Sequence, residues 1–220
     1  ISTRADLSKA IARGNREGGP APFRMGVSQD AKDPTRMSVG IVQSGLGMPN
    51  RDYYLDAKFA SQKAAYEAHV AKLLALSGVP EAQAKADAAR IVALETQIAT
   101  AHWTNVENRQ AEKRYNPVAV AELPAKYPGV DWATFRTITG IEGEAKVIVN
   151  QPSALVGIAK LVETAPLEDW KAWARYHTLR SYSPVLPKAF RDETFAFYGK
   201  TLSGTPQQEE RWKQAVNLTT

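Results

Sequence analysis

Residues 80–106 have the sequence PEAQAKADAARIVALETQIATAHWTNV, and this stretch decides the fold class. Its small and aliphatic side chains recur at steps of three and four residues, at Ala84, Ala88, Ile91, Leu94, Ile98 and Ala101. This spacing places them on one face of a helix, because an α-helix turns once every 3.6 residues. The stretch therefore predicts the longest helix of the chain, from Pro80 to about Val106.

Helical patterns continue on both sides of this stretch. The preceding segment, 60–76, carries apolar residues on one side and is followed by Gly78, a residue type that commonly ends helices. Downstream, prolines mark the starts of further helices, because proline suits the first helical turn. Four are predicted, over 152–163, 166–182, 187–202 and 206–218.

Shorter helices are predicted from their capping residues. Thr3 is placed to cap an amphipathic helix at the start of the chain. Asn116, followed by a proline, predicts a short helix to Lys126, and Asp131 predicts another that ends at Gly140.

The segment between the first helix and residue 44 has the alternating pattern of β-strands. Apolar residues alternate at Phe23, Met25 and Val27 and again at Met37, Val39 and Ile41. The intervening segment 28–35 is rich in turn residues, which indicates a hairpin with a long loop, and 146–150 predicts one more short strand. The expected fold is mainly α: a multi-helix domain with a small β-hairpin near the N-terminus.

Composition narrows the class of protein. The chain has 220 residues, of which 44% are hydrophobic and 23% charged, as expected for one globular domain or two closely packed subdomains. Its net charge of +5 is scattered rather than gathered in a basic stripe, so we expect no nucleic-acid partner. No segment has the apolar length of a membrane span. Both ends, Ile1 and Thr220, look cut from a longer polypeptide.

The sequence contains no recognisable metal or catalytic motif. Zinc peptidases commonly place two histidines four residues apart on a helix with a glutamate between them, whereas His69, His102 and His177 lie far apart. We expect each to be a structural histidine that bonds to its neighbours. Glu95 lies two helical turns before His102, so a buried carboxylate–imidazole contact between them is one alternative. No cysteine is present.

Other motifs have simpler explanations than ligand binding. Gly45 and Gly47 lack the third glycine of a dinucleotide-binding loop. Asp30 and Asp33 are expected to cap turns rather than to hold calcium. The aromatic residues lie beside aliphatic ones at helical spacing and predict core packing; they are Trp103, Trp132, Trp170, Trp173, Trp212, Tyr53, Tyr54, Phe195 and Phe197. Trp170, Trp173 and His177 share one helix face, which indicates a packing ridge or, alternatively, a groove.

Several segments, in this order, resemble the N-terminal domain of the neprilysin and endothelin-converting-enzyme family. The most specific is Gly45-Leu46-Gly47-Met48-Pro49-Asn50-Arg51-Asp52-Tyr53-Tyr54. The other matching segments are 30–36, 93–99 with His102-Trp103, 115–117, 147–149, 197–204 and 211–213. The resemblance covers nearly the whole chain, so residues 1–220 are expected to be part of that non-catalytic helical domain.

The resemblance implies a helical domain that covers a second, zinc-bearing domain, with both enclosing a chamber for short peptides. The HExxH helix of the zinc domain is missing, so no catalytic or zinc-binding residue is assigned and this chain alone is predicted to be inactive. It needs no cofactor itself; zinc would belong to the longer protein. The implied partners are the missing C-terminal catalytic domain and peptide substrates.

Arg51, Asp52 and Tyr53 are the candidate residues for the chamber wall, but the favoured interpretation of these residues is a salt-bridged turn. The cysteine-free, alanine-rich sequence is similar to bacterial relatives, which implies a periplasmic, cell-envelope or secreted location. The alternative function is a stand-alone helical module that binds peptides or proteins through the face of Trp170 and Trp173.

Overall fold

The computed structural model describes residues 1–219, and short connections join its helices and strands. In chain order the elements are α1 (Arg4–Glu17), β1 (Phe23–Gln29), β2 (Met37–Gln43), α2 (Asp52–Leu55), η1 (Ala57–Phe59), α3 (Ala60–Leu76), α4 (Glu81–Ala101), α5 (Asn105–Asn108), η2 (Ala111–Arg114), β3 (Asn116–Ala119), η3 (Val120–Glu122), α6 (Leu123–Lys126), α7 (Trp132–Thr139), β4 (Lys146–Val149), α8 (Pro152–Thr164), α9 (Leu167–Tyr182), α10 (Lys188–Thr194), the π-helical η4 (Phe195–Leu202) and α11 (Arg211–Thr219).

Within the described residues, four strands form one sheet in the order β1-β2-β4-β3. The β1–β2 hairpin is antiparallel, β2 pairs with β4 in parallel, and β3 pairs with β4 antiparallel. Side chains alternate between the two faces of a sheet. One face packs on helices: Phe23 lies with its ring centroid 5.7 Å from that of Trp132 and 5.5 Å from that of Phe135 in α7. The sheet thus has one covered face.

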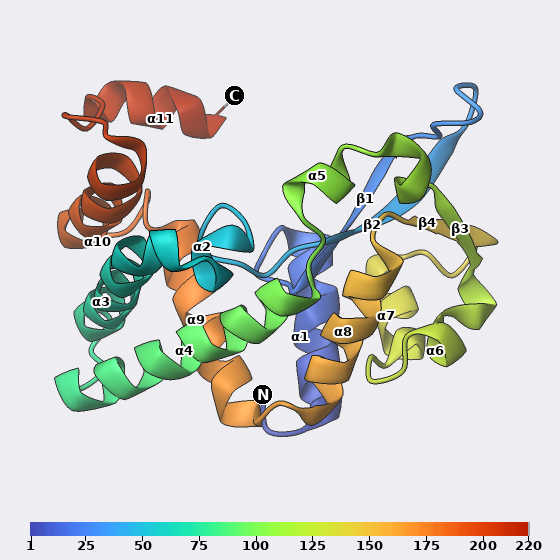
Figure 1. The fold of residues 1–220 in the computed structure, drawn as a ribbon, viewed down its shortest axis with the longest axis horizontal. Helices are drawn as coiled ribbons and strands as arrows, with labels where there is room; N and C mark the ends of the chain where they lie inside the picture. Colours follow the sequence, from blue (N-terminus) through green and yellow to red (C-terminus); the bar gives the residue numbers. More distant parts are fainter. Residues whose placement is uncertain (220) are drawn as a thin grey trace.

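The long helix α4 joins the two ends of the molecule. Figure 1 shows it running from the end that holds α3 and α10 toward the end that holds the sheet. It contacts α3, α8 and α9, and most of its apolar face is buried. Full burial of an aliphatic side chain stabilises a fold by about 1.5–3 kcal/mol. The residues of this face with no exposed surface are Ala88, Ile91, Leu94, Ile98 and Ala99.

The main predictions of fold class are confirmed. The chain is mainly helical with a β-hairpin near its N-terminus, and the predicted helix over 60–76 has these bounds in α3. Thr3 caps α1 through a capping box with Asp6, and Asp131 caps α7, which ends at Gly140. The strand predicted over 146–150 is β4.

The helix predicted over 116–126 is wrong for its first four residues, which form strand β3. Pro117 is tolerated there because β3 is the outer strand of the described sheet on that side, where a missing N–H need not bond to a second neighbour. Helix α6 starts only at Leu123.

Two predicted helix boundaries are also corrected. α4 ends at Ala101 because the backbone of His102 is extended, with φ −66° and ψ 146°, and the next residue donates its N–H to the side-chain oxygen of Gln43. The last helix begins at Arg211, and residues 206–210 are not helical. The segment predicted as one helix over 187–202 changes from α-helix to π-helix at Phe195.

Candidate functional site

The segment 44–51, between β2 and α2, is a loop whose glycines are required by its geometry. Gly45 has φ +99°, a left-handed conformation that favours glycine. At Gly47, a Cβ atom would lie 1.8 Å from the hydroxyl oxygen of Tyr66. A side chain at position 47 therefore cannot be accommodated unless the loop or Tyr66 moves.

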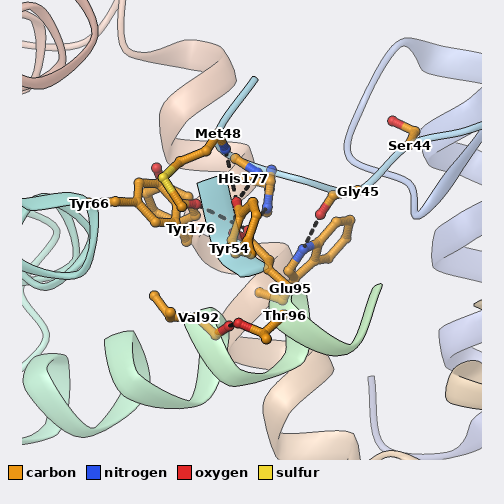
Figure 2. Close-up of polar contacts among 12 residues, drawn as sticks. Ser44, Gly45, Met48, Tyr54, Tyr66, Val92, Glu95, Thr96, Tyr176 and His177 are labelled. Carbon is orange, nitrogen blue, oxygen red and sulfur yellow. Dashed lines mark hydrogen bonds and ion pairs between the residues drawn. The ribbon is translucent and has the colours of Figure 1, made fainter. Parts of the chain in front are cut away.

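Beneath this loop, Glu95 of α4 is a fully buried carboxylate. Its Oε2 accepts a hydrogen bond from the hydroxyl of Tyr54 at 2.6 Å, and its Oε1 accepts one from Tyr66 at 3.1 Å. The Nε2 atom of His177 lies 2.6 Å from Oε1. Figure 2 shows these side chains converging from separate helices, α2, α3, α4 and α9. A buried carboxylate needs such partners, because an unpaired one costs several kcal/mol.

Tyr54 transmits this network to the loop. Its hydroxyl accepts hydrogen bonds from the backbone N–H groups of Gly47 and Met48, at 3.0 and 2.9 Å, while it donates to Glu95. Both loop residues are buried. One phenol oxygen therefore connects the carboxylate on α4 to the backbone of the loop.

The loop carbonyls are bound as well. Trp173 Nε1 donates to the carbonyl of Gly45 at 3.0 Å, and Tyr198 donates to that of Gly47 at 2.9 Å. The ring Nε2 of His102 lies 3.0 Å from the carbonyl oxygen of Ser44. Because hydrogen bonds from α2, α9, η4 and the end of α4 hold the loop, its conformation is fixed by the core beneath it.

The protonation states fit these bonds. Burial, together with the charge of Glu95, raises the pKa of Tyr54 and of Tyr66 well above the usual tyrosine value, so both remain phenol donors at neutral pH. Burial lowers the pKa of His102 to about 4. His102 is therefore neutral at pH 7, and its Nε2–H can donate to the Ser44 carbonyl.

The predicted wall residues lie where this loop meets α2: Arg51 ends the loop, and Asp52 and Tyr53 begin the helix. Arg51 is half-buried and donates from Nη1 to the carbonyl of His102 at 2.8 Å. The Asp52 N–H donates to the side chain of Asn50, and the ring of Tyr53 stacks on Phe59 at 4.2 Å. The salt-bridged turn is wrong, because among the described residues Arg51 and Asp52 form no ion pair.

A polar cavity of about 320 Å³ lies beside the loop. Arg51 lines it, whereas Asp52 and Tyr53 do not. Hydrogen-bonding groups from β2, the loop and the segment after α4 surround it; they include Gln43, Ser44, His102, Trp103 and Asn108. Arg51 is thus the member of the predicted trio that is placed to contact a bound molecule here.

All three histidines are buried and have hydrogen-bond partners, as predicted. His69 Nδ1 lies 3.1 Å from Glu193, and its ring stacks on Phe197 at 5.0 Å. Among residues 1–219 no group of three or more His, Cys, Asp or Glu side chains is arranged to hold a metal ion. The side chains present therefore do not fit a zinc site.

The alternative contact between Glu95 and His102 is not formed, because Glu95 pairs with His177, 82 residues away, and His102 is a structural histidine as expected. One signal in the sequence did mark Glu95. It stands between Leu94 and Ile98 on the apolar face of the long helix, and a charged residue on such a face must have a buried partner. The partner itself could not be deduced from spacing.

The aromatic predictions are confirmed in part. Trp170 and Trp173 are 0% and 3% exposed, so their face is a packing ridge and not a groove. Little of these two side chains is therefore exposed for binding a peptide or protein. Trp173 instead packs on the ring of His177 at 4.3 Å. Trp212 is 63% exposed, and its assignment to the core is wrong.

The turn-capping role of Asp30 and Asp33 is confirmed. Their Oδ1 atoms accept from the backbone N–H groups of Lys32 and Thr35. None of the described helices is both long and apolar enough to span a membrane.

Comparison with known proteins shows the family. The model of the N-terminal region of peptidase family M13 matches residues 1–220. The chain belongs to peptidase family M13. Among curated relatives of this M13 chain, endothelin-converting enzyme 1 of Cavia porcellus is 30% identical over 213 residues, covering 90% of the chain and 27% of the relative. The Homo sapiens enzyme of the same name is 29% identical, with 90% and 26% coverage.

Solved structures agree with this assignment. The M13 chain superposes on the zinc metalloprotease Zmp1 of Mycobacterium tuberculosis in its open state with a TM-score of 0.94 and 37% identity, covering 100% of the chain and 34% of that protein. PepO of Lactobacillus rhamnosis shares the fold, with a TM-score of 0.82 at 18% identity over 99% of the chain and 35% of PepO. The chain thus spans about a quarter to a third of the length of its relatives.

Proposed function

We propose that this chain is a non-catalytic part of a zinc metallopeptidase that cleaves short peptides, and that it forms one wall of an enclosed substrate chamber. The family assignment and the likeness to a zinc metalloprotease of known structure support the peptidase class. Given the family assignment, the zinc and its activated water would be supplied by a C-terminal catalytic domain.

The observation that carries the wall assignment is the loop 44–51. Its backbone is bonded to Tyr54, Trp173 and Tyr198, and it places Arg51 at a polar cavity. A wall that limits substrate size must resist deformation, and a loop tied to a buried carboxylate has that property. An arginine at such a cavity is suited to the carbonyl or carboxylate groups of a peptide.

The test compares cleavage of a short fluorogenic peptide by two proteins, each with added zinc and with a chelator. One is the 220-residue chain, and the other is the chain joined to the catalytic region that its relatives possess. We expect cleavage only by the longer protein and its loss with the chelator. Zinc-dependent cleavage by the 220-residue chain would refute the proposal.

The wall role of Arg51 is tested in the longer protein with Arg51→Gln. We expect KM to rise about threefold to tenfold with little change in kcat, because a contact made equally in the ground and transition states is removed. The matched control is Arg36→Gln, at an exposed position in the hairpin loop. An unchanged KM for the Arg51 variant would remove this residue from the chamber wall.

We also propose a periplasmic, cell-envelope or secreted location. The likeness to bacterial peptidases such as that of Mycobacterium tuberculosis is its support. The test is fusion of the gene to a reporter phosphatase that is active only outside the cytoplasm. Activity equal to that of a cytoplasmic control would contradict this location.

A further inference from the structure

The second face of the sheet, opposite Phe23, holds a cavity of about 470 Å³, which is within the roughly 300–1,000 Å³ range of ligand sites. Part of its floor is bare backbone, since Gly26 of β1 and Gly40 of β2 are register partners on this face. A Cβ atom built on Gly26 would meet nothing within 4 Å. Two adjacent glycines therefore keep this face open. We call this cavity the glycine groove.

The glycine groove is electropositive. Arg24 and Arg114 line it from β1 and from η2 on the opposite wall, and no Asp or Glu is among its lining residues. Arg24 donates to the carbonyl of Gly14 at 3.2 Å, and none of the described carboxylates forms an ion pair with it. The nearby acid Asp30 is already engaged by Tyr115 and Lys146.

Arg24 is half-buried, so this cation is partly withdrawn from water, and the burial lowers its pKa. A partly buried guanidinium without a carboxylate partner gains most from an anionic ligand, because charge-assisted hydrogen bonds are stronger where water is excluded. The groove is therefore complementary in charge to a carboxylate.

The free edge of β1 adds backbone hydrogen-bonding groups to the groove. Met25 N–H points away from β2, because it donates to the side chain of Asn15 at 2.6 Å. Backbone groups on an antiparallel strand alternate in direction, so those of Val27 and Gln29 also point outward. In the described sheet β1 is the outer strand, and both residues line the groove. Such an edge can pair with an extended peptide.

We propose that the glycine groove binds an extended peptide segment that carries acidic side chains, with its backbone along the outer edge of β1 and its carboxylates at Arg24 and Arg114. The choice of a peptide as ligand rests on the proposed function. This site is on the sheet face and is distinct from the cavity at Arg51, since the two share no lining residue.

The test measures binding of the 220-residue chain to a fluorescein-labelled peptide of alternating threonine and glutamate with an amidated C-terminus, by fluorescence anisotropy. A peptide with glutamine in place of glutamate is the reference. We expect the glutamate peptide to bind more tightly, and its affinity to fall as salt is added, because salt screens charges that are partly exposed.

The blocking variant is Gly26→Phe, which fills the groove. Gly26 does not have a positive φ, and a Cβ atom at this position would meet no other atom within 4 Å, so we expect the variant to fold. Affinity should fall at least about tenfold, equivalent to about 1.4 kcal/mol. Gly143→Phe is the matched control, because Gly143 also faces open space but does not line the groove. If Gly26→Phe does not fold, Gly40→Val gives a second block.

The charge requirement is tested with Arg114→Gln and Arg24→Gln. Each should weaken binding of the glutamate peptide by about threefold, a value typical of a partly exposed ion pair, and should leave the glutamine peptide unaffected. Absence of binding by the unaltered chain, equal binding by Gly26→Phe, or equal affinity for the two peptides would each overturn the proposal.

These outcomes are independent of the proposed function. Peptide binding is measured on a chain without the catalytic domain, whereas the peptidase assay is not. If the longer protein cleaves peptides and the groove binds none, the peptidase proposal stands and the groove proposal fails. The reverse result would leave an acidic-peptide site in a protein that is not a peptidase.

Discussion

Replacement of Tyr54 by phenylalanine removes one oxygen atom and leaves three partners without their bond. The backbone N–H groups of Gly47 and Met48 lose their acceptor, and Glu95 loses its 2.6 Å donor. Each buried polar group that is left unsatisfied costs about 1–3 kcal/mol. With one bond per partner at the low end of this range, we expect Tyr54→Phe to reduce the free energy of unfolding by about 3 kcal/mol.

Two further tyrosines calibrate this value. Tyr66→Phe removes a single 3.1 Å bond to Glu95, so we expect a loss of about 1 kcal/mol. Tyr127 is buried, but its hydroxyl bonds to no described residue, and Tyr127→Phe should change stability by less than about 0.5 kcal/mol. The three variants differ from the unaltered chain by the same atom, so their order reports the bonds of each hydroxyl.

Urea unfolding of the 220-residue chain, followed by circular dichroism, measures these differences. For a chain of this length, about 3 kcal/mol corresponds to a fall in melting temperature of about 6–12 °C. Limited proteolysis should also show faster cleavage within the loop 44–51 in Tyr54→Phe than in the unaltered chain. If Tyr54→Phe is no less stable than Tyr127→Phe, Glu95 does not stabilise the loop through Tyr54.

Two further predictions concern the same loop. Gly47→Ala would place a Cβ atom 1.8 Å from the Tyr66 hydroxyl, and we expect the free energy of unfolding in urea to fall by about 1–3 kcal/mol. The control is Gly143→Ala, because Gly143 faces open space. Equal stability of the two variants would contradict the close contact. Because burial lowers the pKa of His102 from 6.5 to about 4, the unfolded chain binds a proton between these pH values that the folded chain does not. Stability should therefore fall as the pH falls from 6.5 to 4, by on the order of 3 kcal/mol from this residue, and His102→Gln should lose less over that interval. Parallel pH profiles for the two proteins would refute this assignment.

Local sequence patterns predicted most of the fold because they reflect local physics. The bounds of α3, the caps at Thr3 and Asp131, and the hairpin follow from helical spacing, capping chemistry and alternation. Strand β3 was missed because Asn116 followed by proline also has the sequence of a helix start. Pairing with β4 decided between the two, and such pairing is set by residues about 30 positions away.

The sequence indicated some residues of the candidate site, but not which of them are hydrogen-bonded to one another. The loop containing Arg51 was identified through resemblance, whereas Glu95 was considered only as a partner of His102. The bond between Glu95 and His177 depends on how α4 packs against α9, which spacing along one helix cannot reveal. The glycine groove was missed for a similar reason: Gly26 and Gly40 face each other only once the hairpin register is known.

The parallel pairing of β2 with β4 has a consequence for synthesis on the ribosome. β2 ends at Gln43 and β4 begins at Lys146, so roughly 100 residues must be translated before β2 acquires its inner neighbour. At a translation rate of about 5–20 residues per second, this edge of β2 stays unpaired for on the order of 10 s. During this interval the nascent chain carries an unpaired strand that can associate with other chains or recruit a chaperone. Synonymous codons that slow translation between α3 and β4 would lengthen the exposure and lower the yield of folded protein without changing a single residue.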